Sequence, residues 1–558
     1  MTPVVQTALL PPAALGWALL LLAIAWSLRS CRAPEASAGL GWRWWALAAV
    51  TLLCFRWPML WVQHQLNPDE SQLIAGALTL RHDPVFWRSV DGGTAGPLDY
   101  YPLLPAAWAD GFTSYAVARL IALTVVYGTI VFGGETLALL AGPALARIAM
   151  LPALAALAFT TTPDFAHYST ELMPALLLAA AGYLAGRQVH TPAPRQLWLI
   201  ALLLGGVLWA KLQAAPLAGV LWLLVAVHEY RAGRTRSLVP LVAGALLPTL
   251  LCLGAALLTG QTQHLVVPYV LHNFAYVGSP HFSLWENVAG QWQNALIDGY
   301  FGFWLAGAAL CLAPLALNSA RTAPVAARHA AIAAALLFAI GVFSALAPRR
   351  ASAHHLQLVP LPLLWLTGTV LALAWPREDA PGAARRRVLA AGLFLACALG
   401  PQLAWRVAGV DSFAAINAAG VSPARRQLVS LVRTFSSAGE PLALWGWRCS
   451  LYVEAGRPQA TRQAQTEAQI YPGPLQPYFL RRYFEDFQAA NPPVFADAVG
   501  PGNFSYQDRA KAHECFPPLR AWVAARYTQV ADLDGTRLYV RNDRVAGGRR
   551  ALSVPAIP

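Results

Sequence analysis

The sequence predicts an all-α polytopic membrane protein with a C-terminal extracytoplasmic domain of mixed α and β structure. Three observations lead to this fold class: 57% of the residues are apolar, only 12% are charged, and the polarity becomes ordinary after residue 405. A soluble globular protein carries about 25% charged residues, so about half of the expected charge is missing. The composition therefore excludes a disordered chain, a solvated coiled coil and an ordinary cytosolic enzyme.

Long apolar runs predict about twelve membrane-spanning helices, because a helix needs about 20 apolar residues to cross the bilayer core. The predicted spans cover residues 11–28, 43–62, 115–134, 141–161, 171–186, 197–212, 214–230, 238–259, 299–317, 329–347, 356–375 and 388–405. The stretch 197–230 is long enough for two short helices, which we expect to be broken at residues 210–213.

The distribution of arginine predicts the orientation of these spans. Fourteen arginines lie in five alternate loops, and the loops on the opposite side hold four or five. Arginine-rich loops stay in the cytoplasm, so the sparse side is predicted to be extracytoplasmic. The outer loops then lie near residues 63–114, 162–170, 260–298 and 348–355. The net charge of +13 follows from this pattern and does not indicate a nucleic-acid partner.

The predicted domain organisation is a membrane domain over residues 1–405, an extracytoplasmic α/β domain over 406–545 and a disordered tail over 546–558. Within the second domain we expect strands near 442–445 and 537–541, and helices near 423–437 and 478–490. Cys449 and Cys515 are the two cysteines in a polar region, which leaves a disulfide between them open. The aromatic-rich segment 260–298 is typical of helices along the membrane interface, either as anchors or as a lid.

The first outer loop carries the most informative polar residues, because ionisable groups near hydrocarbon are costly. Pro68 is predicted to end the preceding span, and Asp69 is placed to cap a short helix that begins near Glu70. The functional interpretation is a carboxylate at the membrane surface that accepts a proton from an incoming hydroxyl. Farther along, Tyr100 and Tyr101 offer flat faces to a sugar.

This loop resembles the first extracytoplasmic loop of the GT-C glycosyltransferases, and more narrowly that of the bacterial aminoarabinose-transferase and protein-mannosyltransferase branch. The resemblance consists of an acidic pair after a membrane helix, an Asp-Pro stretch and the series Gly-Pro-Leu-Asp-Tyr-Tyr over residues 96–101. It extends over about residues 43–405. Two features depart from the family: two spans precede the loop instead of one, and Thr94 to Pro97 lack the basic residue that family members usually carry there.

The resemblance implies an integral enzyme of the bacterial inner membrane that takes a sugar from a polyprenyl-phosphate carrier. By position, it makes Asp69 the general base and Glu70 its neighbour. The family's second acidic loop corresponds to Asp164–Glu171, which includes His167. The pair His354 and His355 resembles the family's entry into a proline-rich helix.

Transfer from such a carrier also requires cations for the phosphate leaving group. The candidates on the predicted outer face are Lys211, Arg349, Arg350, His354 and His355. Lys211 alternatively extends to the membrane interface, and the two arginines alternatively bind lipid headgroups. A divalent cation is the one cofactor considered, with Glu171 and His167 as ligands, or with the paired histidines beside Glu171.

We therefore expect a glycosyltransferase that moves a monosaccharide, with inversion, from a polyprenyl-phosphate carrier to a hydroxyl of a glycan, lipid or protein on the extracytoplasmic face. A transporter or flippase for a lipid-linked substrate is the alternative. Carboxylates that cluster at one surface, instead of mid-bilayer, count against it. A third hypothesis is a non-catalytic assembly partner whose outer domain binds envelope glycans.

Overall fold

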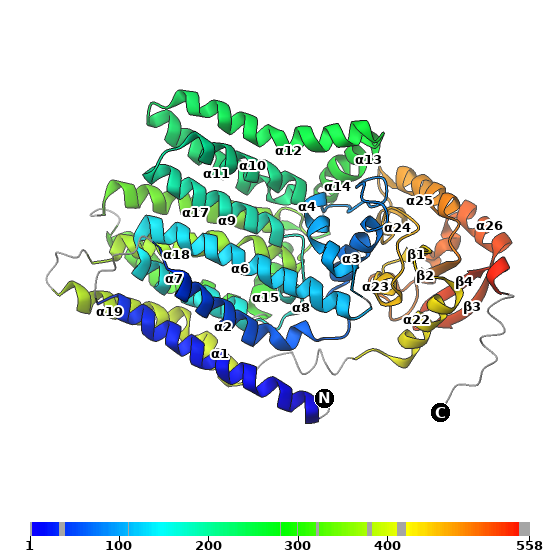
Figure 1. Cartoon of the computed structure of the whole chain (residues 1–558), viewed down its shortest axis with the longest axis horizontal. Helices are drawn as coiled ribbons and strands as arrows, with labels where there is room; N and C mark the ends of the chain where they lie inside the picture. Colours follow the sequence, from blue (N-terminus) through cyan, green and yellow to red (C-terminus); the bar gives the residue numbers. More distant parts are fainter. Residues whose placement is uncertain are drawn as a thin grey trace. The chain divides into compact units, whose positions relative to one another are not determined.

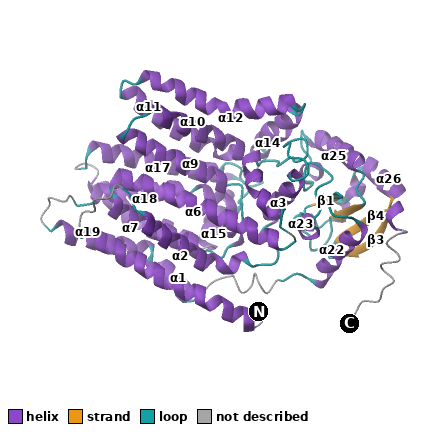
Figure 2. Ribbon diagram, viewed as in Figure 1, coloured by secondary structure: helices purple, strands orange, loops and turns teal. Residues whose placement is uncertain are grey.

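The computed structural model describes residues 3–32, 39–109, 111–279, 281–297, 299–319, 323–376, 382–409 and 420–545. Helices dominate these residues, and the strands lie in the C-terminal part (Figures 1 and 2). The predicted fold class, an all-α polytopic membrane protein with a small C-terminal α/β domain, is confirmed. The side of the membrane that this domain occupies stays a prediction.

The chain forms two compact units, which do not follow the order of the sequence. The helical unit contains the described residues of 1–61, 122–252 and 277–418. The sheet unit contains the described residues of 62–121, 253–276 and 419–558. The predicted boundary at 405/406 stays a prediction, and the predicted disordered tail over 546–558 lies outside the described residues.

Each of the twelve predicted apolar runs contains helix. The helices are α1 (Pro3–Ser30), α2 (Trp42–Leu60), α6 (Thr113–Ala141), α7 (Pro143–Phe159), α9 (Leu172–His190), α10 (Pro194–Ala210), α11 (Ala215–Arg231), α12 (Leu238–Leu258), α16 (Tyr300–Ser319), α17 (Val325–Leu346), α18 (Pro360–Ala374), and α19 (Ala383–Ala398) followed by α20 (Gly400–Val407). In the described residues, seven helices are long and apolar enough to cross a membrane, or eight if the bent pair α19–α20 counts as one span. The number of twelve spans therefore stays a prediction.

Close packing of helices in the helical unit depends on small residues, as is usual where lipid surrounds a bundle. Pairs such as α9 with α10 and α17 with α18 pack along their lengths (Figure 1). A Cβ atom on Gly205 of α10 would lie 2.3 Å from the backbone oxygen of Ala245 in α12. Any larger residue at position 205 would therefore separate these two helices.

The predicted break between α10 and α11 is confirmed. Lys211 has an extended backbone, with φ −150° and ψ 120°, and a short 3₁₀ turn over Leu212–Ala214 leads into α11. The amide of Lys211 still donates to the carbonyl of Val207 at 3.0 Å and so completes the last turn of α10. The break holds the Lys211 side chain at the junction of two helices.

A four-stranded mixed sheet forms the centre of the sheet unit. Its strands are β1 (Leu442–Gly446), β2 (Val494–Ala498), β3 (Tyr527–Leu533) and β4 (Thr536–Arg541), in the order β1-β2-β4-β3. The β1–β2 pair is parallel, and the other two pairs are antiparallel. The strands and helices that we predicted in this region are confirmed, with the helices found as α22 (Pro423–Phe435) and α25 (Gln476–Ala490).

Helices cover both faces of this sheet, because alternate side chains of a strand point to opposite sides. Leu442 and Leu444 join a core with Val432 of α22. Ala443 and Trp445 join a second core with Tyr483 of α25. The short helix α23 (Ser450–Ala455) completes the first core, and α26 (Pro517–Arg526) completes the second.

The first predicted outer loop belongs to the sheet unit. Its helix α3 (Pro68–Leu80) packs against α23 and contributes Ala75 to the core of the sheet. The hydroxyl of Thr79 accepts the amide of Gln459 at 3.0 Å, across 380 residues of sequence. The loop also contains the short helices α4 (Pro97–Tyr100) and α5 (Leu104–Ala107).

The predicted start of this helix is wrong in two details. Asn67, not Asp69, is the N-cap, and its Oδ1 accepts the amide of Asp69 at 2.8 Å. Pro68 lies in the first turn of α3 and does not end the preceding span, since α2 already ends at Leu60. An N-cap asparagine followed by proline is a favourable start for a helix, which explains the earlier beginning.

Cys449 and Cys515 are both free thiols, and the Cys449 sulfur donates to the carbonyl of Ala464 at 3.4 Å, so they form no disulfide.

The segment 260–298 contains the helices α13 (Thr262–Leu265), α14 (His272–Gly278) and α15 (Leu284–Ile297). Trp285 and Trp292 of α15 are exposed, as expected for an interfacial helix.

We predict that Phe495→Ala destabilises the sheet by about 3–5 kcal/mol, because the ring is fully buried and its loss leaves a cavity. Hydrogen exchange of the β1 and β2 amides in the full chain measures the change. Phe504→Ala is the control, since this ring is 51% exposed and its loss leaves amide protection unchanged. Equal protection in the Phe495 variant and the wild type would contradict the assignment of this core.

Candidate active site

Glu70 and Arg119 form a buried ion pair in the sheet unit. The Nε of Arg119 donates to Glu70 Oε1 at 2.7 Å, and its Nη2 donates to Oε2 at 2.9 Å. The two side chains are 0% and 1% exposed. This paired geometry is the strongest that arginine and a carboxylate form, and it holds α3 and the first turns of α6 together.

The same pair organises the loop before α3. Arg119 donates to the carbonyls of Val62 and His64, both at 2.6 Å. Glu70 Oε2 accepts the amide of Leu66 at 2.8 Å. Both oxygens of the Glu70 carboxylate and all three nitrogens of the Arg119 guanidinium form hydrogen bonds. Glu70 is therefore a structural anchor for the segment that carries Asp69.

Asp69 lies in the first turn of α3, one residue before this anchor. Its side chain is half-buried, whereas Glu70 is fully buried, so Asp69 is the more exposed member of the acidic pair. The Cys449 thiol lies close by: burial raises the pKa of this thiol, and the charge of Asp69 raises it further. The sheet unit therefore contributes to the surroundings of Asp69.

Tyr100 does not present a flat face to a ligand, contrary to the prediction. It is 1% exposed, and its ring packs against Phe86 and the glycines at 76 and 92. Tyr101 is less buried, and its hydroxyl donates to the carbonyl of Pro84 at 2.8 Å. Tyr100 is therefore part of the packed interior of this loop.

The glycine-rich turn of this loop is anchored by a buried ion pair that the sequence analysis missed. The carboxylate of Asp91 accepts from Arg482 of α25 and from the amide of Gly93 at 2.8 Å. Gly93 has φ +61°, a conformation that glycine adopts without strain. The partners lie 391 residues apart, so no local sequence signal identifies the pair.

A second polar cluster lies in the helical unit, at the break between α10 and α11. We call it the helix-break cluster; its members are Thr170, Glu171, Lys211, His354 and His355. The Lys211 ammonium donates to the Glu171 carboxylate and, at 2.5 Å, to the hydroxyl of Thr170. Lys211 is 3% exposed, so the alternative that it extends to the membrane interface is wrong.

Glu171 is fully buried in this cluster, and its carboxylate forms an ion pair with the Lys211 ammonium. A buried carboxylate of this kind needs cations as partners, and it keeps them close.

His354 and His355 stand next to Glu171, with ring centroids 4.7 Å apart and planes nearly perpendicular. The Nδ1 of His354 lies 3.4 Å from a carboxylate oxygen of Asp164. One ligand atom each from Glu171, His354 and His355 lies within 4.8 Å of the others. Imidazole and carboxylate donors at such spacing suit a divalent cation, and His355 Nδ1 has no hydrogen-bond partner among the described residues.

His167 is not part of this grouping in the structure. Its Nδ1 bonds to the carbonyl of Pro163 at 2.8 Å, within the short helix α8 (Pro163–Ala166) and its C-cap. The possible cation ligands beside Glu171 are therefore the two later histidines.

The adjacent arginines differ from each other. Arg350 contacts the ring of His281 and donates to the carbonyl of Ser279 at 3.3 Å. The Arg349 side chain is exposed, and its backbone has φ +50°. Of the two, Arg349 is more accessible to an anionic ligand.

Arg56 is a positioning residue that the sequence analysis missed. It lies on α2, is 5% exposed, and donates to the carbonyls of Thr160 at 3.3 Å and Phe165 at 2.8 Å. These bonds hold the loop that leads to Glu171. An arginine inside the apolar run 43–62 is the signal that identifies it.

Two solved structures of ArnT from Cupriavidus metallidurans resemble the chain. The structure bound to undecaprenyl phosphate matches with a TM-score of 0.57 and 13% identity, over 89% of this chain and 98% of that chain. The apo structure matches with a TM-score of 0.56 and 12% identity, over 92% and 99%. ArnT is an aminoarabinose transferase of the GT-C type. The chain has the GT-C fold.

An oligosaccharyltransferase from Archaeoglobus fulgidus also matches this chain, with a TM-score of 0.41 and 12% identity, over 94% of this chain and 74% of that chain. No family model and no curated protein sequence matches the chain.

We predict that Arg119→Met costs the protein about 3–5 kcal/mol of stability, because the buried Glu70 carboxylate loses its partner. Glu70→Gln should have a similar effect. The double variant Glu70→Leu, Arg119→Met should regain most of the loss, since no buried charge remains. Thermal unfolding of the four proteins in detergent measures these changes. Arg88→Met, which removes an exposed ion pair with Asp83, is the control and should change little. Wild-type stability of both single variants would contradict the claim that the Glu70–Arg119 ion pair stabilises the fold.

Proposed function

We propose that the protein is a membrane glycosyltransferase that transfers a monosaccharide from a polyprenyl-phosphate carrier to an acceptor hydroxyl, with inversion. The GT-C fold supports this class of enzyme, and an ArnT structure of that fold holds undecaprenyl phosphate. We further propose that it lies in the bacterial inner membrane, with the sheet unit and the reaction on the extracytoplasmic face. The acceptor is a glycan, a lipid or a protein.

The observation that carries this proposal is the different burial and pairing of the two acidic residues at the start of α3. Glu70 is locked by Arg119, and the adjacent Asp69 is accessible at the start of the helix. In the proposed reaction, Asp69 is the catalytic residue: its carboxylate accepts the proton of the acceptor hydroxyl. Glu70 acts through Asp69 and is a positioning residue.

The bond changes define what else the enzyme must supply. The acceptor oxygen forms a bond to the anomeric carbon as the bond between that carbon and the carrier phosphate breaks. The phosphate leaves with the electron pair, so its negative charge grows. Cations that face this charge lower the barrier, which is a role we assign to Lys211 and Arg349.

Lys211 is suited to this role by its surroundings. Its charge is balanced by Glu171 at the break, which keeps the ammonium at one position in a buried site. His354 and His355 lie beside Glu171, and His354 also approaches the carboxylate of Asp164. A divalent cation held by Glu171 and the two histidines would supply Lewis-acid stabilisation of the leaving phosphate.

We predict that Asp69→Asn lowers transfer by about 100-fold or more, because the amide cannot accept the proton. The assay uses membranes, a radiolabelled polyprenyl-phosphate sugar and an envelope acceptor fraction, and it separates transfer from translocation of the donor. Asp83→Asn, in the same loop but paired with Arg88 at the surface, is the matched control. Wild-type transfer by a normally expressed Asp69→Asn protein would remove Asp69 from the mechanism. Translocation without transfer would favour a flippase.

We also predict that the protein purified without chelator contains a bound divalent metal, and that His355→Ala loses it. Elemental analysis measures the metal content directly. Transfer should fall on treatment with EDTA and return when Mn²⁺ or Mg²⁺ is added. His329→Ala, an exposed histidine of α17, is the control. Full transfer in EDTA, with no metal in the wild type, would assign the helix-break cluster to phosphate binding alone.

A further inference from the structure

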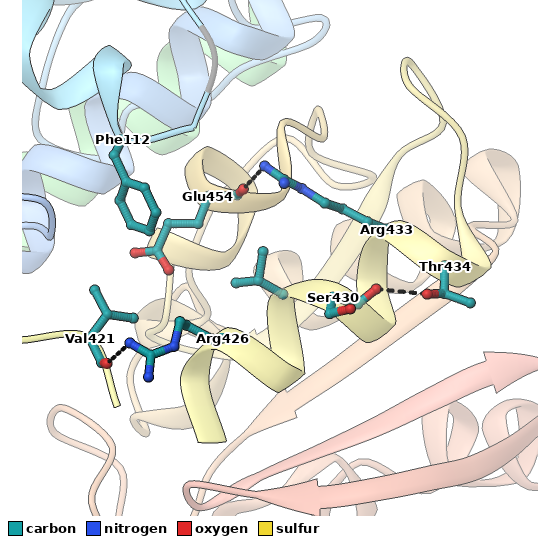
Figure 3. Close-up of a pocket in the computed structure, with 8 residues that line it drawn as sticks. Phe112, Val421, Arg426, Ser430, Arg433, Thr434 and Glu454 are labelled. Carbon is teal, nitrogen blue, oxygen red and sulfur yellow. Dashed lines mark hydrogen bonds between the residues drawn. The ribbon is translucent and has the colours of Figure 1, made fainter. Parts of the chain in front are cut away.

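A cavity of about 380 Å³ lies in the sheet unit, next to α22 (Figure 3). Phe112 and Glu454 face the helix, and Arg426, Ser430, Arg433 and Thr434 line the cavity from α22. None of these residues belongs to the acidic pair of α3 or to the helix-break cluster. Ligand sites in proteins usually measure about 300–1,000 Å³, so this cavity has room for a small molecule.

The spacing along α22 places the polar side chains on one face. Arg426, Ser430 and Thr434 follow one another at intervals of four residues, and Arg433 lies seven residues after Arg426. Residues at these spacings share one side of a helix. Two guanidinium groups and the Ser430 hydroxyl therefore line the same cavity, whereas the Thr434 hydroxyl donates to the carbonyl of Ser430 at 2.9 Å (Figure 3).

The charges around the cavity are not balanced. The one carboxylate in its wall, that of Glu454, is taken by the neighbouring Arg425 in a paired interaction. Arg426 donates to the carbonyl of Val421 at 2.8 Å, and Arg433 donates to the backbone carbonyl of Glu454 at 2.6 Å (Figure 3). Within the part of the chain that the structure describes, neither of these two arginines pairs with a carboxylate.

Backbone carbonyls hold the two arginines in place without neutralising them. A guanidinium has five N–H donors, so each arginine retains donors for a ligand after its bond to a carbonyl. Structural arginines of the same unit differ: Arg482 pairs with Asp91, and Arg537 with Asp497. An arginine pair that is positioned but not compensated is suited to an anion.

We propose that this cavity binds the phosphate group of a small ligand, with Arg426 and Arg433 on the phosphate oxygens and Ser430 as a hydroxyl donor. Arginine binds phosphate through two parallel N–H donors, which favours phosphate over a simple halide. Phe112 is 39% exposed and provides an apolar wall for the part of the ligand beyond the phosphate. The phosphate belongs either to a soluble sugar phosphate or to an anionic lipid headgroup. The proposal is independent of the glycosyltransferase activity.

The test measures binding of glucose 6-phosphate to the full chain in a non-ionic detergent, by isothermal titration calorimetry. We expect saturable binding by the wild type, weakened about tenfold or more in the double variant Arg426→Gln, Arg433→Gln, since that variant loses both charged donors to the phosphate. Arg520→Gln, an exposed arginine of α26, is the matched control and should bind like the wild type. Arg425 is left intact in all variants, so that the Glu454 carboxylate keeps its partner.

A second arm identifies the source of the phosphate. The wild type is placed in nanodiscs of phosphatidylcholine, with and without phosphatidylglycerol, and the titration is repeated. Weaker binding of the sugar phosphate in the presence of phosphatidylglycerol assigns the cavity to a lipid headgroup, and unchanged binding assigns it to a soluble phosphate. Equal affinity of the wild type and the double variant would overturn the proposal. The absence of saturable binding in detergent would also overturn it, if phosphatidylglycerol co-purifies equally with the wild type and the double variant. A normal size-exclusion profile and thermal midpoint of the double variant show that it is folded.

Discussion

The buried ion pair of Glu70 and Arg119 is the interaction on which the candidate site depends. It joins α3 to the start of α6, and through three backbone groups it also fixes the loop before α3. Taking two charges out of water is costly unless all their hydrogen-bonding groups are satisfied. Here they are satisfied by one another and by the backbone, so the pair fixes the position of α3, and the Asn67 cap fixes Asp69 in its first turn.

The same constraint shapes the helical unit. Lys211, Glu171 and Arg56 lie at or beside apolar helices, where unpaired charge is strongly unfavourable. Each is therefore held by a specific partner: Lys211 by Glu171, and Arg56 by the carbonyls that precede Glu171. The outcome is a compact group of ionisable side chains held by specific partners, and this is the group to which the proposed function assigns the leaving phosphate.

The residue types of the candidate site were predictable from the sequence, but their partners were not. Apolar runs, the helix break at Lys211 and the acidic loops are local patterns, and the structure contains the helices and the break as predicted. Tyr100 shows the limit of such patterns. An aromatic residue after a glycine-rich turn predicts a surface for a ligand, but the Tyr100 ring packs against Gly76 inside the protein. Whether an aromatic side chain is buried depends on which distant segment covers it.

The sequence by itself determined the helical, membrane-embedded class of the protein and the presence of a small C-terminal α/β domain, because hydrophobic periodicity and charge scarcity are local properties of the chain. Tertiary structure decided that the loop over 62–121 packs with the sheet and that Asp91 meets Arg482. It also decided that Glu171 gathers His354 and His355, and not His167. These are contacts between residues far apart in sequence, and side-chain partners at such separations are set by packing and by the need to neutralise buried charge.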